Sequence, residues 1–292
     1  ILLGPMLSYS QKTYVPDDNF ENYLEANGMG DGIPLNDSVL TANISSVTSL
    51  NVSNFGISDL TGIEDFISIQ YLYCKDNNLI TLDLSQNTAL IHLYAERNQL
   101  VSIDVINSNL LVWLFCYNNQ LTNLNVSSAI LLERLWCQNN QLTILDVSNN
   151  TSLIELRCSN NQLTNLNVSQ NIALDVLKFG QNQLSNIDIS QNPVLTQFDS
   201  QYNLITSLDV SQNTILSRLN CRYNQLSSLD ISQDPALTEL YCDGNQITSL
   251  DLSQNTSLST LWCQNNLITN LDLSQNTLLT ILTCETNNIT SL

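Results

Sequence analysis

The chain has 292 residues, of which eight are Lys or Arg and twenty-seven are Asp or Glu, so its formal net charge is −19. Hydrophobic residues make up 43%, which is enough to build a core and excludes an acidic disordered tail. The scarcity of basic residues argues against binding to nucleic acid or anionic lipid, and no apolar stretch reaches the roughly 20 residues that a membrane-spanning helix needs.

The N-terminal segment, ILLGPMLSYSQ, is an apolar run that ends in small residues. A run of this kind, ending at Ser8-Tyr9-Ser10, is typical of the last part of a secretory signal with a cleavage point before Gln11. We therefore expect residues 1–10 to be the remnant of a signal peptide and the mature protein to be secreted or held at the cell surface. A frayed N-terminal strand is the alternative.

Residues 11–43 precede the repeats and are expected to form an N-terminal cap. Asp17 or Asp18 can cap the start of a short helix, and Gly28 can end it. The apolar face of this helix is formed by Phe20, Tyr23 and Leu24.

From residue 44 onward one pattern recurs, L-x-x-L-x-C-x-x-N-x-L-x-x-L-D-L-S-Q-N-T-x. The units begin at Val47, Ile69, Leu90, Leu111, Leu132, Leu153, Leu174, Leu195, Leu216, Leu237, Leu258 and Leu279. The first unit has 22 residues, the next ten have 21 each, and the twelfth stops at Leu292 after fourteen. Such regularity predicts a solenoid in which each unit packs only on its neighbours, and the truncated last unit leads us to expect a longer natural protein.

Within each unit, positions 1, 4, 6, 11, 14 and 16 are apolar and are predicted to face inward. The period of two around positions 3 to 7 predicts a short strand, and stacking the units places these strands in one parallel sheet. Position 9 is Asn in every unit from Asn77 to Asn287, where a buried carboxamide can bond the backbone of neighbouring units. The rest of the unit is too short for a helix, so we expect extended or turn-like structure there, with or without a second narrow ladder.

These units resemble the leucine-rich repeats of secreted bacterial proteins, and the first, SVTSLNVSNFGISDLTGIEDF, is similar to the internalin type. The resemblance covers residues 44–292. It implies a mostly β solenoid: a right-handed horseshoe or superhelix with the parallel sheet on its concave face, a turn-like convex side and a short capping helix. Recognition of another protein is the commonest role of that family.

The cysteines all occupy the inward position 6. They are Cys74, Cys116, Cys137, Cys158, Cys221, Cys242, Cys263 and Cys284. Opposite side chains in adjacent parallel strands keep their Cβ atoms about 4.8 Å apart, which is more than a disulfide normally spans. We predict buried free thiols that pack as small hydrophobic groups. A zinc site is the alternative, but a single-file column does not converge four sulfurs on one ion.

Positions 2, 3, 5, 7 and 8 should point outward from the sheet, and they differ between units far more than the rest. They hold all three Trp, seven of the ten Tyr, the one His and seven of the eight basic residues. This concentration predicts a binding surface on the concave face. The candidate binding residues are Tyr71, Tyr73, His92, Tyr94, Trp113, Phe115, Tyr117, Trp136, Arg157, Tyr241 and Trp262.

Two structural interpretations compete with binding. Residues 21 apart lie side by side, and this pairs six of the seven basic residues with an acid in the next unit: Lys75–Glu96, Asp76–Arg97, Arg134–Glu155, Lys178–Asp199, Arg218–Glu239 and Arg222–Asp243. Only Arg157 lacks such a neighbour, so it is the charged residue that we expect to contact a ligand. Stacked rings also stabilise adjacent strands, but eight rings on an open face would form a larger apolar patch than a soluble protein usually leaves bare.

Position 15 carries a column of acids on the outer side. It contains Asp83, Asp104, Asp146, Asp188, Asp209, Asp230, Asp251 and Asp272, interrupted by Asn125 and Asn167. Hydrogen bonding within the following turn is the local interpretation of this column, and calcium binding is the alternative.

No arrangement of nucleophile and base, phosphate-binding loop or metal-ligand spacing is present, so we expect neither an enzyme nor a cofactor. The sequence favours a secreted or cell-surface recognition or adhesion module that binds a protein partner through its concave face. A glycan-binding surface protein, whose rings stack on sugars, and a passive spacer for other domains are the alternatives.

Overall fold

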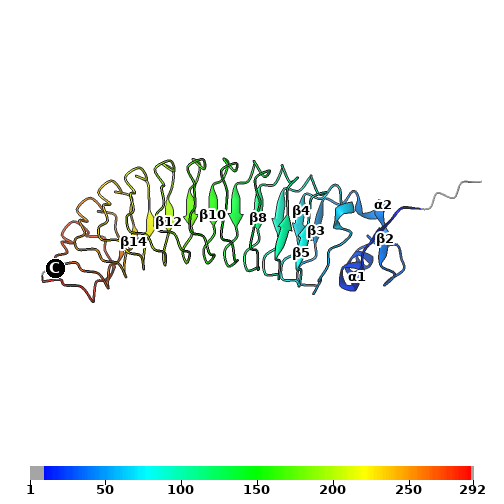
Figure 1. Cartoon of the computed structure of the whole chain (residues 1–292), viewed down its shortest axis with the longest axis horizontal. Coiled ribbons are helices and arrows are strands. Elements are labelled where there is room, and N and C mark those ends of the chain that lie inside the picture. The colour runs from blue at the N-terminus through cyan, green and yellow to red at the C-terminus, as the bar shows by residue number, and fades with distance from the viewer. Residues whose placement is uncertain (1–9, 291–292) are drawn as a thin grey trace, which may run out of the picture.

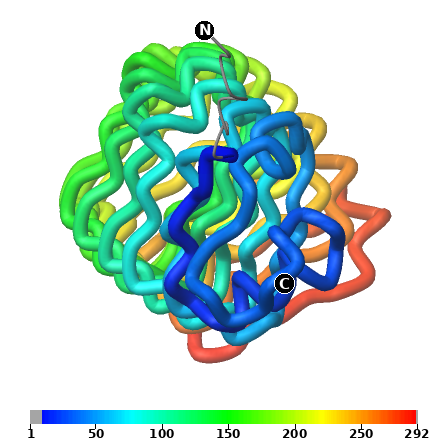
Figure 2. Tube along the Cα trace, turned by 90° about the vertical axis from the view of Figure 1, so that its right-hand side faces the viewer, coloured from blue at the N-terminus to red at the C-terminus, as the bar shows by residue number. Residues whose placement is uncertain are grey.

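The computed structural model describes residues 10–290, and the chain forms a solenoid that curves along its length (Figure 1). A view along the long axis shows its coils stacked one behind another (Figure 2). The predicted signal-peptide remnant lies, except for Ser10, outside the described residues.

A single parallel sheet of 12 strands runs through the solenoid, with the strands in chain order. They are β3 (Ser49–Asn51), β4 (Tyr71–Tyr73), β6 (His92–Tyr94), β8 (Trp113–Phe115), β9 (Arg134–Trp136), β10 (Glu155–Arg157), β11 (Val176–Lys178), β12 (Gln197–Asp199), β13 (Arg218–Asn220), β14 (Glu239–Tyr241), β15 (Thr260–Trp262) and β16 (Ile281–Thr283). Residues one unit apart are register partners, such as Leu156 with Leu135 and Leu177. The predicted solenoid, sheet and register are therefore confirmed.

The apolar positions of the repeat form the core. In the unit that contains β10 they are Leu153, Leu156, Cys158, Leu163, Leu166 and Val168, none more than 4% exposed. Each unit buries the same set against its two neighbours, and a fully buried Leu contributes about 1.5–3 kcal/mol.

The asparagines of position 9 close the turn after each strand. Asn161 donates from Nδ2 to the carbonyl oxygens of Cys137 and Cys158, both at 3.0 Å, and its Oδ1 accepts the backbone N–H of Leu142 at 3.0 Å. The bonds run between units and within one, so the column ties the turns together as predicted.

The convex side is mostly turns, with one narrow ladder. β5 (Thr81–Asp83) pairs in parallel with β7 (Ser102–Asp104), and a 3-10 turn, η1, spans Ile63–Asp65. A second buried asparagine column, at position 19, was not predicted from the sequence, because asparagine in an S-Q-N-T run has the composition of an exposed turn.

The N-terminal end is covered by two helices and a strand pair. The helix α1 (Asp18–Ala26) starts at the N-cap Asp17 and is followed by Gly28, whose φ is +74°. Phe20 and Leu24 are buried under it, as its pattern predicted. The antiparallel pair β1 (Lys12–Tyr14) and β2 (Ser38–Leu40) and the helix α2 (Thr41–Ile44) were not predicted.

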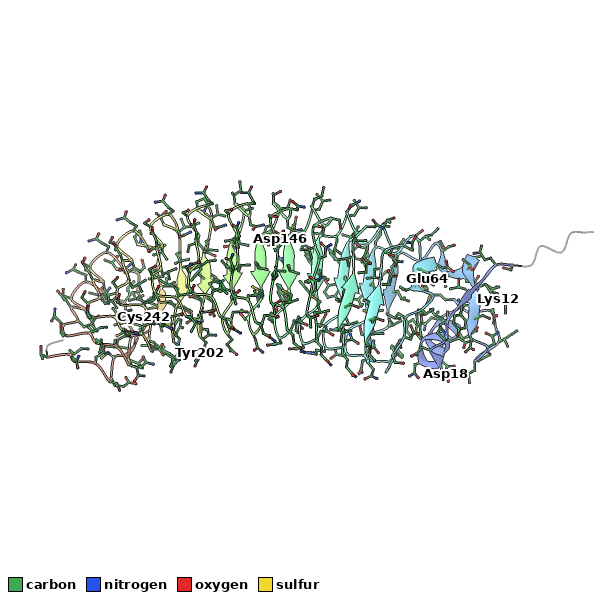
Figure 3. All side chains as sticks on the ribbon, in the orientation of Figure 1. Lys12, Asp18, Glu64, Asp146, Tyr202 and Cys242 are labelled. Atoms are coloured by element: carbon green, nitrogen blue, oxygen red, sulfur yellow. The ribbon has the colours of Figure 1, made fainter. Side chains whose placement is uncertain are left out.

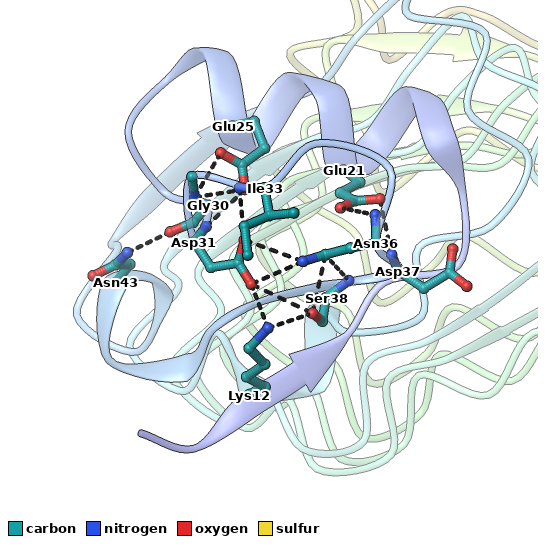
Figure 4. Close-up of polar contacts among 11 residues, drawn as sticks. Lys12, Glu21, Glu25, Gly30, Asp31, Ile33, Asn36, Asp37, Ser38 and Asn43 are labelled. Atoms are coloured by element: carbon teal, nitrogen blue, oxygen red, sulfur yellow. Dashed lines mark hydrogen bonds and ion pairs between the residues drawn. The ribbon is translucent and has the colours of Figure 1, made fainter. Parts of the chain in front are cut away.

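A polar network holds this end together (Figure 4). Lys12 Nζ lies 2.6 Å from Asp31 Oδ2, and Asn36 Nδ2 donates to the same carboxylate. The hydrogen bond from Lys12 lowers the pKa of Asp31 to about 2. Glu25 accepts the backbone N–H of Asp31 at 2.7 Å, so the loop after α1 is anchored to both the helix and β1.

All eight cysteines are free thiols, seven of them buried and Cys284 partly so. Burial raises the pKa of Cys137, Cys221 and Cys263 to about 12, so these groups stay protonated at neutral pH. The prediction of packed free thiols is confirmed. No helix among residues 10–290 is long and apolar enough to cross a bilayer.

Candidate functional site

The sheet face consists of the side chains at positions 2, 3, 5, 7 and 8, which point outward from the 12-stranded sheet. Its rings form two groups. The first aromatic group contains Tyr71, Tyr73, His92, Tyr94, Trp113, Phe115, Tyr117 and Trp136. The second aromatic group contains Tyr202, Tyr223, Tyr241 and Trp262. Strands β10 and β11 carry no outward ring and lie between the groups.

In the first aromatic group the rings of neighbouring strands pack on one another. At position 5, Tyr73 stacks on Tyr94 at 4.6 Å between centroids, and Phe115 stacks on Trp136 at 4.3 Å. At position 3, His92 stacks on Trp113 at 4.1 Å with the planes 1° apart. The predicted residues are thus brought together into one continuous set.

The rings of the first aromatic group are partly exposed. Phe115 is only 8% exposed, and the other seven members of the first aromatic group are half-buried. The rings cover one another because adjacent strands bring their faces within stacking distance.

Arginines close the remaining faces of the two tryptophans. The guanidinium carbon of Arg134 lies 4.9 Å from the centre of the Trp113 ring, and that of Arg157 lies 4.3 Å from the centre of Trp136. His92 and Arg134 come from the strands on either side of Trp113, so this indole is sandwiched between them. Trp136 lies in the same way between neighbours from β8 and β10.

Four of the six predicted cross-strand ion pairs form. They are Arg97–Asp76, Arg134–Glu155, Arg218–Glu239 and Arg222–Asp243. Within residues 10–290, no ion pair joins Lys75 to Glu96 or Lys178 to Asp199. The arginines reach the acids and the shorter lysines do not.

Arg157 has no acid in its column, as predicted, but it pairs with an acid of its own strand. Its Nη2 lies 2.5 Å from Glu155 Oε1, and its Nε donates to the same oxygen at 2.6 Å. Glu155 stands two residues earlier on the same side of β10, a neighbour that comparison of adjacent units does not reveal.

Lys178 lies near the centre of the sheet face and forms no ion pair with any of the residues that the structure describes. Glu155 is bound by Arg157, and Asp199 accepts a hydrogen bond from Asn220 Nδ2 at 3.0 Å. Burial, together with the charge of Arg157 on the adjacent strand, lowers the pKa of Lys178. An anionic group placed against Lys178 would compensate both the burial of its charge and its repulsion by Arg157.

The second aromatic group contains the most exposed rings of the sheet face. Tyr202 and Tyr223 stack at 4.5 Å and are 46% and 37% exposed. Both have positive φ, +54° and +49°, at position 8 of their units. Every unit from Asp76 to Thr286 has a positive φ at this position, so the conformation belongs to the turn of the repeat and does not distinguish these two tyrosines. Tyr202 lies at the lower edge of the solenoid in Figure 3.

The two residues of this second group that the sequence predicted, Tyr241 and Trp262, meet edge to face at 5.3 Å. Arg222 lies 4.8 Å from the centre of Trp262 and pairs with the buried carboxylate of Asp243 at 2.8 Å. The structure therefore divides the predicted site into two separate clusters.

The acid column of position 15 is bonded locally. In every case the Asp Oδ1 accepts the backbone N–H two residues later at 2.9–3.0 Å, as in Asp146 with Ser148. These bonds lower the pKa of the exposed carboxyl groups from Asp188 to Asp272, which confirms the local interpretation.

The one carboxylate group in the described part of the chain with spacing suited to a metal lies elsewhere, at the cap. It consists of Asp18, Glu21 and Asp37. Glu21 already accepts the backbone N–H groups of Asn36 and Asp37, so its oxygens are engaged without an ion.

Comparison with known proteins also finds leucine-rich repeats. Residues 235–276 match the family model "Leucine Rich repeats (2 copies)". Internalin J of Listeria monocytogenes serotype 4b is 39% identical over 75 residues, which cover 26% of this chain and 8% of the relative. The solved functional domain of InlJ from Listeria monocytogenes, described as including a cysteine ladder, is similar with a TM-score of 0.91 and 36% identity over 98% of this chain and 64% of that one.

The plant peptide hormone receptor RGFR1, solved in complex with RGF2, shares only the fold: its TM-score is 0.70 at 22% identity, over 82% of this chain and 42% of the receptor. The likeness to InlJ extends from the repeat pattern to the inward cysteines and nearly the whole length of the present chain. The chain therefore has the leucine-rich-repeat fold and is similar to the internalins, and it spans 64% of the solved InlJ domain and 8% of the full-length internalin J.

Proposed function

We propose that the sheet face binds a protein partner, and that the protein acts in recognition or adhesion outside the cell. The observation that carries this proposal is the confinement of stacked tryptophans, tyrosines and arginines to one face. These residue types dominate the energetic centres of protein interfaces. Solenoid proteins commonly use their concave sheet in this way, and the distant structural neighbour RGFR1 is solved with RGF2 bound.

The geometry also indicates which contacts would matter. Arg157 and Trp136 form a rigid pair at the border of the first aromatic group, and the unpaired Lys178 lies on the next strand. We propose that a partner packs on the ring edges of this pair and places an acidic side chain on Lys178. The partly buried ion pair of Arg157 with Glu155 keeps its guanidinium oriented before the partner arrives.

Glycan binding is the weaker candidate at this position. A sugar stacks on a free ring face, but both faces of Trp113 and of Trp136 are covered by neighbouring side chains. The rings thus offer edges rather than platforms.

The test is binding of the protein to an array of extracellular protein ectodomains and to a glycan array. For a protein that binds, we expect Trp136→Ala to weaken binding at least about tenfold and Lys178→Gln about three- to tenfold. The exposed convex substitution Gln170→Glu, which changes the charge by the same amount as Lys178→Gln, should leave binding unchanged. Glycan binders alone, or no effect of either sheet-face variant, would contradict the proposal; absence of binding on both arrays would favour the spacer function.

A further inference from the structure

The second asparagine column, at position 19, joins consecutive turns on the convex side. Each side chain donates from Nδ2 to two backbone carbonyl oxygens of the preceding unit, and its Oδ1 is buried without a partner. For Asn213 these carbonyls belong to Ile189 at 3.1 Å and Asn192 at 2.9 Å, and for Asn255 to Ile231 and Asp234, both at 2.9 Å. The column is interrupted at Ser108, Ala129 and Asp234, and every asparagine in it contributes a hydrogen-bond donor.

Asp234 occupies the same position and has no such donor when ionised. Its backbone follows the others: its N–H donates to Ile231 O and its carbonyl accepts Leu237 N–H, both at 3.1 Å. By the register of the column, its side chain faces the carbonyl oxygens of Val210 and Asn213. The side chain is 0% exposed, and neither carboxylate oxygen has a hydrogen-bond partner.

The protonation state of Asp234 decides whether its side chain can form a hydrogen bond to the preceding unit. A protonated carboxyl group can donate to one of the two facing carbonyl oxygens, as an asparagine does. An ionised carboxylate brings a buried negative charge against two oxygen atoms with nothing to compensate it.

The charged groups around Asp234 reinforce this. The titratable group that acts on it is Asp230, four residues earlier in the same turn, and Asp209 and Asp251 of the adjacent turns act in turn on Asp230. Within residues 10–290, no cation forms an ion pair with Asp234. Burial, and then the charge of Asp230, raise its pKa to about 7.

We propose that Asp234 is a proton-controlled joint of the solenoid, which holds the convex turn between β13 and β14 closed when protonated and loosens it when ionised. The sheet-face ends of these two strands are bridged by the ion pair of Arg218 with Glu239. Opening of the convex turn therefore loosens the contact between the two units that carry Tyr223 and Tyr241 of the second aromatic group. The joint does not depend on the proposed partner.

The direction of the pH effect follows from the raised pKa. An aspartate in the unfolded chain ionises near pH 4, whereas Asp234 keeps its proton to about pH 7 in the folded chain. Its stabilising contribution is complete below about pH 4, falls as the pH rises to about 7, and is constant above. Within that window the opening equilibrium of the turn increases by up to about tenfold per pH unit.

Asp234→Asn tests the joint, because it supplies the donor that asparagine provides at this position in the units on either side. The measurement is hydrogen exchange of the backbone amides of residues 229–240 in the full chain, from pH 4 to pH 9, after correction for intrinsic exchange. We expect the ratio of opening constants, original over variant, to rise between pH 4 and 7 and to reach at least about a hundredfold by pH 8. Asn213→Asp, the reverse change one unit earlier, should create the same pH dependence at residues 208–219.

Three results would overturn the proposal. One is a ratio that does not change with pH. Another is a pH dependence that persists in the Asp234→Asn variant. The third is full protection of the original chain at pH 8 once calcium is added, which would make the group a cation ligand instead.

Discussion

Replacing Asn161 by alanine is expected to lower the free energy of unfolding by about 3 kcal/mol. The substitution removes three hydrogen bonds at a side chain that is 8% exposed. It leaves the N–H of Leu142 unpaired and removes a donor from the carbonyls of Cys137 and Cys158. Each buried polar group left without a partner costs about 1–3 kcal/mol, and water that enters the site lowers this cost by replacing some of the lost hydrogen bonds. Urea denaturation of the full chain measures the loss.

Gln162→Ala is the matched control for Asn161→Ala. The Gln162 side chain is exposed in the same turn, so its removal should change stability by less than about 0.5 kcal/mol. Because the carbonyl of Cys137 also accepts from Asn140, the damage should extend to the preceding unit and appear there as faster hydrogen exchange. A loss below 1 kcal/mol for Asn161→Ala would show that the column does not hold the turns together.

Replacing Asp17 by alanine is the second large expected effect, about 2 kcal/mol. One oxygen of Asp17 accepts the N–H groups of Asn19 and Phe20, both at 3.0 Å, and so caps α1. The other oxygen accepts the N–H and hydroxyl of Ser58, both at 2.8 Å, which fixes the helix to the first repeat. Loss of a cap costs about 1 kcal/mol, and charged hydrogen bonds are about twice as strong as neutral ones.

Asp17→Asn separates the two roles, since the amide keeps an oxygen for the helix and presents a donor to Ser58. It should lose about half as much stability as Asp17→Ala in thermal unfolding. Burial raises the pKa of Asp17, but the hydrogen bonds from Ser58 and Phe20 outweigh it and hold the pKa below its ordinary value. The stabilisation by the ionised group is therefore present above about pH 4 and is lost as the pH falls through the lowered pKa, so Asp17→Asn should converge with the original chain in acid. Equal losses at all pH values would contradict this assignment.

The repeat itself was predictable because its physics is local and redundant. Eleven asparagines at one position and the alternation around each strand specify inward and outward faces, and a frame error would expose the whole core. The start of α1 at Asp17 and its end before Gly28 follow from short-range capping rules.

The details of the site were not predictable in the same way. The pairing of Arg157 with Glu155 and the burial of Phe115 depend on which rotamers fit between neighbouring strands, and adjacency in a column does not specify rotamers. The role of position 19 was missed because asparagine in a turn is usually exposed. Asp234 stands out only once the donor function of its column is known.

The most direct test of the central claim is photo-crosslinking that compares the two faces. A photoreactive residue is placed at Ser159 on the sheet face, or at the exposed convex position Gln191, and the protein is incubated with the strongest binder from the ectodomain array. We predict a covalent adduct from position 159 whose yield falls when Lys178→Gln or Trp136→Ala is added, and no adduct from position 191. An adduct from position 191 alone, or one from 159 whose yield is unchanged in both variants, would contradict recognition through the sheet face.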